Sequence, residues 1–286
     1  MQSIKHFLQE TLRRIGIYNR LKASIFYDFY WCIAGNQIIM ARSEEVDFYR
    51  NLLQGLKKGN MIFDIGANLG HKTDIFLRLG AQVVAVEPDE YNQNVLKQKF
   101  LKLRFSSKPV FIVGKAVSDR KETAEMWIEK PGSAMNTLSR KWADTLRMDG
   151  KRFGHTLDFR SHKEVQTITL EDLINKFGPP FFVKIDVEGH EAPVLRGLKH
   201  SVPFLSFEIN LPEFMPEALE CIEYLAHLNA DGQFNYTADC TRGFALDRWS
   251  GKSDFLNALR ACQETSIEIF WRNAESVFSP LESFKT

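Results

Sequence analysis

DIGANLG, residues 64–70, sets the architecture of this chain. It follows the apolar run MIFDI (61–65) and precedes HKTDIFLRLG (71–80), whose pattern predicts a helix. A glycine turn between a buried strand and a helix is the place where doubly wound α/β sheets bind nucleotides. Gly66 and Gly70 let the backbone turn sharply and approach a ligand closely, because neither has a Cβ. We therefore expect a ligand site at residues 64–70.

The rest of the chain continues this alternation. Uninterrupted apolar runs such as VVAV and VFIV predict strands covered on both faces, as in a parallel sheet, and strands that alternate with helices are typical of βαβ units. We expect one α/β domain with seven strands, at about 61–65, 81–88, 109–117, 181–187, 203–210, 233–238 and 266–271. Asp89 is expected to cap a helix that runs to about Leu103, and Thr169 to cap another.

The composition narrows the classes of partner. Of the 286 residues, 44% are hydrophobic and 26% charged, and the formal net charge is +1. Nucleic-acid binding usually needs a basic stripe, so this balance gives no support to a nucleic-acid partner. Four scattered cysteines without a CxxC pair argue against a zinc site and a disulfide framework, and they fit a reducing cytoplasm: Cys32, Cys221, Cys240 and Cys262.

Two segments stand outside the repeating pattern. Residues 1–45 are expected to form a helical segment, a lid, a dimer contact or a peripheral membrane helix, before a domain at 46–286. The longest apolar region in it, FYWCIAGNQIIMA (29–41), is too short for a bilayer, which takes about 20 residues. Residues 120–165 interrupt the strand–helix rhythm and are expected to be an insertion that forms the substrate site.

A second dense cluster of ionisable residues lies in VKIDVEGHEAPVLRG (183–197). Asp186, Glu188, His190 and Glu191 crowd together just after an apolar run, which costs electrostatic energy unless water or a ligand reaches them. The segment is either a solvated corner between a strand and a helix or the floor of an active site. Glu191 also suits the first turn of the following helix, where the helix dipole favours a negative charge.

The ordered motifs DIGANLG, VAVEPD (84–89), KAVSD (115–119), VKIDVEGHEAPVLRG and FLSFEIN (204–210) resemble those of the FkbM-type methyltransferases. The resemblance implies a Rossmann-like sheet of seven mostly parallel strands with an antiparallel last strand. It also implies S-adenosyl-L-methionine as cofactor and methylation of a hydroxyl on a glycan or secondary metabolite.

Site residues follow from the same resemblance. Asp64, Gly66, Ala67, Asn68 and Gly70 are expected around the methionine part of the cofactor, and Glu87 on its ribose. Residues after the third strand and at the end of the fourth complete the expected cofactor site, namely Val117, Ser118, Asp119 and Asp186. For Ser118 and Asp119, a surface turn is an equal alternative.

A hydroxyl acceptor needs a base, because an aliphatic hydroxyl is a very weak acid at pH 7. Asp186 and Glu188 are the favoured candidates, with His190 and Glu191 behind them. FkbM-type sequences often carry a small residue at the His190 position, which weakens the case for an essential base there. Asp186, Glu188 and Glu208 could instead hold Mg²⁺, a hard cation with carboxylate ligands, but no spacing is diagnostic and a metal is not favoured.

Other interpretations remain open. Trp127 and Trp142 could stack on a sugar ring or anchor the inserted segment, and the basic residues Arg152, His155, Arg160 and His162 could meet an anionic substrate or simply be solvated. A nicotinamide-dependent dehydrogenase is the nearest chemical rival, disfavoured because the G-x-G-x-x-G spacing is missing. A non-catalytic binding module on the same fold is the other. The sequence determines neither the acceptor nor the oligomeric state.

Overall fold

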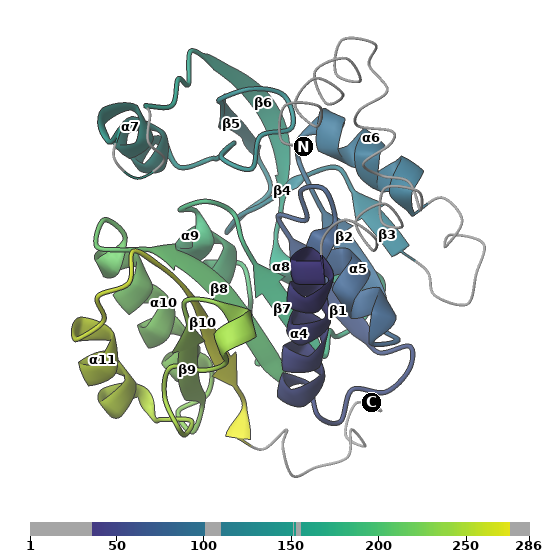
Figure 1. Ribbon diagram of the computed structural model, residues 1–286. Helices are drawn as coiled ribbons and strands as arrows, with labels where there is room; N and C mark the ends of the chain where they lie inside the picture. Colours follow the sequence, from purple (N-terminus) through teal and green to yellow (C-terminus); the bar gives the residue numbers. More distant parts are fainter. Residues whose placement is uncertain (1–35, 101–109, 151, 153–155, 275–286) are drawn as a thin grey trace.

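The framework of the molecule is a seven-stranded sheet in the order β3-β2-β1-β7-β8-β10-β9 (Figure 1). The structure is a computed structural model that describes residues 36–100, 110–150, 152 and 156–274, with side chains from residue 43. Neighbouring strands are parallel except where β10 pairs antiparallel with β8 and β9. The strands are β1 (Met61–Ile65), β2 (Gln82–Val86), β3 (Val110–Val113), β7 (Phe182–Ile185), β8 (Phe204–Asn210), β9 (Gln233–Thr237) and β10 (Ser266–Arg272). This confirms the expected mostly parallel sheet with an antiparallel last strand.

Helices cover both faces of this sheet (Figure 1). Side chains alternate along the strands, so Ile62 packs toward α4, α5 and α6, whereas its neighbour Phe63 packs toward α8, α9 and α10. Each strand is thus covered by apolar residues on both faces, which explains why the apolar runs in the sequence are uninterrupted. The helices are α4 (Asn36–Leu52), α5 (His71–Arg78), α6 (Glu90–Lys99), α7 (Arg140–Met148), α8 (Leu170–Phe177), α9 (Glu191–Arg196), α10 (Met215–Leu228) and α11 (Lys252–Arg260), with a short 3₁₀ turn at Cys240–Arg242.

Local capping signals fix where two of these helices begin. Asp89 accepts a hydrogen bond from the Tyr91 backbone N–H at the start of α6. Thr169 and Asp172 form a reciprocal capping box at the start of α8. Both caps confirm the expectation from sequence. The predicted extension of the first helix to Leu103 lies partly outside the described residues, and α6 itself ends at Lys99.

The third strand differs from the expectation. The apolar segment 109–117 was expected to be one strand, but it divides between two sheets, as β3 and as β4 (Ala116–Val117). The reason is a long-range pairing, because β4 bonds in parallel to β6 (Ser161–Ile168) instead of to the main sheet. β6 also pairs antiparallel with β5 (Thr123–Ile128). Residues 120–165, the expected insertion, contain β5, α7 and the first part of β6, and β4 completes a three-stranded sheet with β5 and β6 (Figure 1).

The expected N-terminal segment lies mostly outside the described part of the chain. The expected boundary between this segment and the domain, at residue 45, falls inside α4. Tyr49 on the same helix is fully buried against Phe76 and Phe182. The proposed lid, dimer or membrane role of residues 1–45 therefore stays a prediction. Among the described helices, none combines the length and apolarity that crossing a bilayer requires.

Candidate active site

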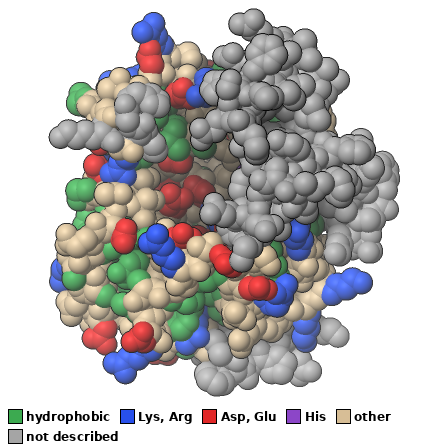
Figure 2. Space-filling model, viewed as in Figure 1, with side chains coloured by type: hydrophobic (Ala, Val, Ile, Leu, Met, Phe, Trp, Pro, Cys, Tyr) green, Lys and Arg blue, Asp and Glu red, His purple; other side chains and the backbone are tan. Residues whose placement is uncertain are grey.

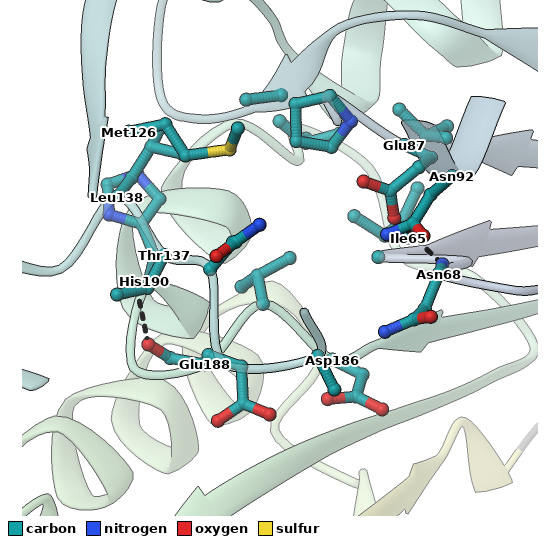
Figure 3. Close-up of a pocket in the computed structure, with 18 of the residues that line it drawn as sticks. Ile65, Asn68, Glu87, Asn92, Met126, Thr137, Leu138, Asp186, Glu188 and His190 are labelled. Atoms are coloured by element: carbon teal, nitrogen blue, oxygen red, sulfur yellow. Dashed lines mark hydrogen bonds between the residues drawn. The ribbon is translucent and has the colours of Figure 1, made fainter. Parts of the chain in front are cut away.

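A cavity opens where the sheet changes direction, between β1 and β7. Strands β2 and β3 extend the sheet from β1 to one side, and β8 extends it from β7 to the other, so this is the switch point at which doubly wound sheets bind ligands. The cavity holds about 670 Å³ of empty space, part of which is open to solvent. Its walls come from the ends of β1, β2 and β7, the β4 region and the segment before α7 (Figure 3).

The glycine loop after β1 forms one wall. Gly66 and Asn68 have left-handed backbone angles, with φ of 81° and 48°, and both line the cavity. A Cβ on Gly66 would lie 1.7 Å from the Asp186 carbonyl oxygen, so only glycine lets this loop lie against the end of β7. Ala67 is buried behind it, and the backbone N–H groups of Gly66 and Ala67 both donate to the Val86 carbonyl.

Asp64 and Gly70 support this loop from outside the cavity. Asp64 is buried and accepts a 2.5 Å hydrogen bond from the Thr73 hydroxyl, which ties β1 to α5. Burial raises its pKa, while the nearby Lys184 ammonium acts in the opposite direction. Gly70 precedes α5, and a Cβ there would meet Leu96 at 2.6 Å. The structure therefore places both residues behind the lining of the cavity.

Glu87 lines the opposite end of the glycine loop (Figure 3). One carboxylate oxygen accepts the Asn68 N–H at 2.8 Å, and the other accepts the Asp89 N–H at 2.8 Å. Burial raises the pKa of Glu87 to about 7, although these backbone hydrogen bonds oppose the shift. The carboxylate is thus fixed at the end of β2, and each oxygen retains a lone pair for a ligand.

Asp186 forms the floor of the cavity. Its Oδ2 lies 2.8 Å from Lys184 Nζ, two residues earlier on β7, and the Lys184 side chain is 3% exposed. Burial tends to raise the pKa of Asp186, but the Lys184 charge and hydrogen bond lower it further, so the net shift is downward. This ion pair keeps Asp186 ionised.

Glu188 lies on the far side of the cavity floor from the glycine loop (Figure 3). Its φ of 56° is unusual for a residue with a side chain, and such strain clusters at functional sites. The Trp142 indole N–H donates to its Oε2 at 2.9 Å, and the Thr137 hydroxyl donates to its backbone oxygen at 2.6 Å. Burial, followed by the charges of Asp186 and Glu208, raises the pKa of Glu188 well above its usual range.

Glu208 lines a different hollow from these two carboxylates, although its charge acts on both of them. It accepts a 2.9 Å hydrogen bond from the Ser266 hydroxyl and lines a separate hollow with Lys72, Cys240 and Glu268. Burial raises its pKa to about 7. Within the described residues, no three His, Cys, Asp or Glu side chains are arranged to hold a metal ion. Figure 2 shows acidic side chains gathered in a hollow in the middle of this face.

Of the neighbours His190 and Glu191, only His190 lines the cavity. His190 lines the cavity, and its Nε2 lies 3.1 Å from the Ser118 hydroxyl. Burial lowers the pKa of His190 to about 4, so its imidazole is neutral at pH 7. Glu191 is not among the residues that line the cavity, and it accepts hydrogen bonds from the backbone N–H groups of Val187 and Gly189 at 3.2 and 3.1 Å.

The residues expected after the third strand are also divided. Val117 lines the cavity, whereas Ser118 reaches it only through His190. Asp119 lies outside the lining, and its Oδ2 is 3.6 Å from Arg196 Nε.

Two further sequence hypotheses concern the inserted segment. Trp142 is fully buried against Phe214 and donates to Glu188, so it anchors the segment and holds a site residue. Arg152 bonds Glu213 at 2.7 Å and lies over the Trp142 ring, so its charge is already used within the protein. Arg147 and Arg140 lie over the Trp127 ring. The remaining basic residues are less informative: Arg160 pairs with Asp158, His162 lies near Glu125, and His155 is outside the described residues.

Three site residues were missed from the sequence. Lys184 shares a strand face with Asp186 because the two are two residues apart, so strand alternation alone could have identified it. Thr137 and Asn92 also line the cavity. Thr137 lies far from the recognised motifs, and Asn92 lies three residues after VAVEPD but outside it, so no motif marks either residue.

The comparison with protein families decides what this site belongs to. Residues 64–234, more than half of the 286 residues, match the model described as the methyltransferase FkbM domain. The chain belongs to the FkbM methyltransferase family. The cavity lies inside the matched region, as do the glycine loop, Glu87 and the 183–197 segment. A search of curated protein sequences found no significant match for this family member.

Three solved structures to which the chain is similar are named as methyltransferases. One is the methyltransferase FkbM from Methylobacillus flagellatus KT, with 15% identity, a TM-score of 0.46, and coverage of 76% of this chain and 45% of that chain. This FkbM-family chain therefore spans less than half of that protein's length. A TehB-like SAM-dependent methyltransferase from Corynebacterium glutamicum ATCC 13032 Kitasato has 11% identity and a TM-score of 0.41, covering 90% and 99%. A precorrin-6y C5,15-methyltransferase from Geobacter metallireducens GS-15 has 11% identity and a TM-score of 0.38, covering 81% and 86%.

Proposed function

We propose that this FkbM-family protein uses S-adenosyl-L-methionine to methylate a hydroxyl group of a glycan or secondary metabolite, in the cytoplasm. The observation that carries the proposal is the single cavity that holds Glu87 at one end and Asp186 with Glu188 at the other (Figure 3). One end suits a nucleoside and the other suits the chemistry of a hydroxyl acceptor.

The residues present fit this cofactor. Glu87 presents free acceptor lone pairs for two ribose hydroxyls, and Ala116, Val117 and Met126 give an apolar wall for a flat base. The glycine loop brings backbone rather than side chains to the middle of the cavity, which leaves room for the remainder of the ligand.

The chemistry required of the protein is limited. When bound, S-adenosylmethionine supplies a methyl group on a sulfonium, which is already a good leaving group. The protein must align the acceptor oxygen and remove its proton. Asp186, kept ionised by Lys184, accepts a hydrogen bond from the acceptor hydroxyl and orients it. Glu188, whose carboxylate has a raised pKa, takes the proton.

His190 and Glu191 have supporting parts in this proposal. His190 is neutral and already bonded to Ser118, and its lowered pKa makes it a weak base. Glu191 holds the loop of Val187 and Gly189 through backbone hydrogen bonds, which fixes the direction of Glu188 between them. A divalent metal has no part in this scheme, since Lys184 already neutralises the charge of Asp186.

Calorimetry with S-adenosylhomocysteine tests the cofactor. We expect binding that Glu87→Ala abolishes and that Glu90→Ala leaves unchanged, because Glu90 is an exposed carboxylate only three residues later, in the first turn of α6. No heat at millimolar ligand would contradict the proposal, and binding of NADH instead would favour the dehydrogenase alternative.

A second measurement separates an enzyme from a binding module. A panel of sugars, sugar nucleotides and hydroxylated metabolites is incubated with S-adenosylmethionine, and release of S-adenosylhomocysteine is followed. Turnover with at least one hydroxylated acceptor is expected. Cofactor binding without turnover of any acceptor would favour the non-catalytic module on this fold.

A further inference from the structure

Residues 129–138, the bridging loop, connect β5 to α7 and form part of the cavity wall. Five of them line the cavity, namely Ser133, Ala134, Asn136, Thr137 and Leu138. The loop begins and ends beside β5, because Trp127 and Thr137 exchange backbone hydrogen bonds at 2.7 and 3.1 Å. Glu87 and Glu188 lie on opposite sides of the same cavity (Figure 3). The loop is attached to both sides, at Asp89 and at Glu188.

Asp89 holds the loop at the first of these sides. Its Oδ2 accepts hydrogen bonds from the Gly132 N–H at 2.9 Å and from the Asn136 side-chain amide at 2.8 Å. Its Oδ1 caps α6 by accepting the Tyr91 N–H at 2.8 Å. Asp89 is 7% exposed, so these donors replace the water that would otherwise solvate its carboxylate. Because hydrogen bonds to an ionised group are stronger than neutral ones, Asp89 fixes the loop firmly to the start of α6.

Gly132 shows how closely the loop packs against α6. Its φ is 77°, and a Cβ on it would lie 2.4 Å from Cδ1 of Tyr91. A side chain at this position would therefore push the loop away from the helix. This steric fit supports the attachment independently of the Asp89 hydrogen bonds.

The second attachment of the loop is to Glu188. The Thr137 hydroxyl donates to the Glu188 carbonyl oxygen at 2.6 Å and accepts the Ser139 N–H at 2.8 Å. The Glu188 backbone has a φ of 56°, so this bond holds a strained residue. The backbone N–H of Asp89 donates to Glu87 Oε1 at 2.8 Å. A movement of the loop away from Asp89 would therefore also move the group that holds Glu188.

We propose that Asp89 is a positioning residue that latches the bridging loop, so that Thr137 holds Glu188 in place only while the loop is attached to α6. The inference rests on the proposed function, which assigns Glu87 to the methyl donor and Glu188 to the acceptor. Asp89 is not among the residues that line the cavity, and it acts through the loop. A donor bound on Glu87 restrains that carboxylate and the Asp89 N–H beside it, so its binding also steadies the loop and the Glu188 turn.

The test releases the latch in two independent ways. Asp89→Ser keeps a hydroxyl that can cap α6 but loses the oxygen that holds Gly132 and Asn136. Gly132→Ala pushes the loop away from Tyr91, and adding Tyr91→Ala to the same chain should restore the space. Gly178→Ala is the matched control, because Gly178 has a φ of 91° but open space around it.

Hydrogen exchange of the full chain, followed by mass spectrometry with and without S-adenosylhomocysteine, reports on the latch. In wild type, we expect the ligand to slow exchange in residues 129–138 and in residues 186–190. In Asp89→Ser and Gly132→Ala, exchange of residues 129–138 without ligand should be at least about tenfold faster, the size of one lost hydrogen bond to a carboxylate. The ligand should no longer slow exchange in residues 186–190 of these two variants.

Turnover separates positioning from folding. With a turned-over acceptor from the panel, Asp89→Ser and Gly132→Ala are expected to lose about tenfold or more in kcat, because the base is misplaced. Their affinity for S-adenosylhomocysteine should change by less than about threefold, because Glu87 keeps both of its backbone donors. The Gly132→Ala/Tyr91→Ala chain should recover most of the lost kcat, and Gly178→Ala should match wild type. A purely structural role of Asp89 would lower stability without changing the effect of the ligand on residues 186–190.

Two results would overturn the proposal. One is ligand-induced protection of residues 186–190 that is as large in Asp89→Ser as in wild type, and the other is Gly132→Ala behaving as Gly178→Ala does. If Asp89→Ser does not fold, the comparison of Gly132→Ala with its Tyr91→Ala rescue decides alone. In these cases S-adenosylhomocysteine still binds to wild type, so the proposed function survives and only the latch fails. Failure of wild type to bind S-adenosylhomocysteine at all removes both.

Discussion

Lys184 and Asp186 form an ion pair at the floor of the cavity, with 2.8 Å between Nζ and Oδ2. Lys184 lies on β7 and is almost completely buried, and Asp186 follows the end of that strand. Lys184 is also opposite Asp64 in the register of β1 and β7, so a single buried ammonium serves two carboxylates. The pair explains how a carboxylate can stay ionised next to Glu188.

Asp186→Asn tests the orienting role of that carboxylate. The amide keeps the size of the side chain but loses the charge, so we expect a folded protein with methyl transfer reduced by about 10²–10⁴-fold. Affinity for S-adenosylhomocysteine should change by less than about tenfold. The measurement is turnover beside calorimetry, and full activity of the variant would remove Asp186 from the mechanism.

Lys184→Met tests the ion pair from the other side. Removing the ammonium leaves Asp186 and Asp64 without their shared counter-charge, and breaking a buried pair in this way typically costs about 3–5 kcal/mol. Urea unfolding measures the loss, with the exposed Lys176→Met as control. A free energy of unfolding equal to that of the control would show that the pair contributes nothing.

Gly66→Ala tests the close contact between the glycine loop and β7. The added Cβ would meet the Asp186 carbonyl oxygen at 1.7 Å, and the residue also has a φ of 81°. Gly178→Ala is a matched control, because Gly178 has a φ of 91° but open space around it. We expect Gly66→Ala to lose S-adenosylhomocysteine binding and to be destabilised by at least about 2 kcal/mol more than the control. Similar unfolding curves for the two variants would contradict the contact.

Trp142→Phe tests how Glu188 is held. The indole N–H stabilises the ionised carboxylate, so its loss raises the pKa of Glu188 further. Because the proposed base must be ionised to act, the rising limb of the pH–rate profile should move to higher pH. Stability should fall by about 1–2 kcal/mol. An unchanged pH profile would separate Glu188 from the proton transfer.

Glu191→Gln tests how the buried carboxylate of Glu191 changes the stability of the protein with pH. Burial raises the pKa of Glu191 to about 8 from 4.5, so between these values the folded state binds more protons than the unfolded state. Stability from this group is therefore lost as pH rises from about 4.5 to 8. Glutamine keeps an acceptor oxygen without the charge, so the decline in unfolding free energy over this range should be shallower, by up to about 1.4 kcal/mol per pH unit. Exposed Glu220→Gln controls for removing one charge, and parallel slopes for wild type and Glu191→Gln would refute the assignment.

Much of the framework could be read from the sequence because the signals are local. Short apolar runs at 61–65 and 204–210 indicate strands with both faces covered, and the caps at Asp89 and Thr169 act within three residues. The positions of Glu87 and Asp186 at strand ends follow from the same local patterns. The FkbM motifs then placed both residues in one site.

Tertiary structure decided the rest, because the deciding contacts join residues far apart in the chain. The division of 109–117 depends on pairing with β6, about fifty residues later. The direction of Glu188 depends on Trp142, which lies on another element far away in the chain. Sequence periodicity fixes which side chains share a face of one element. It does not determine which carboxylates face the same cavity, since that depends on how separate elements pack.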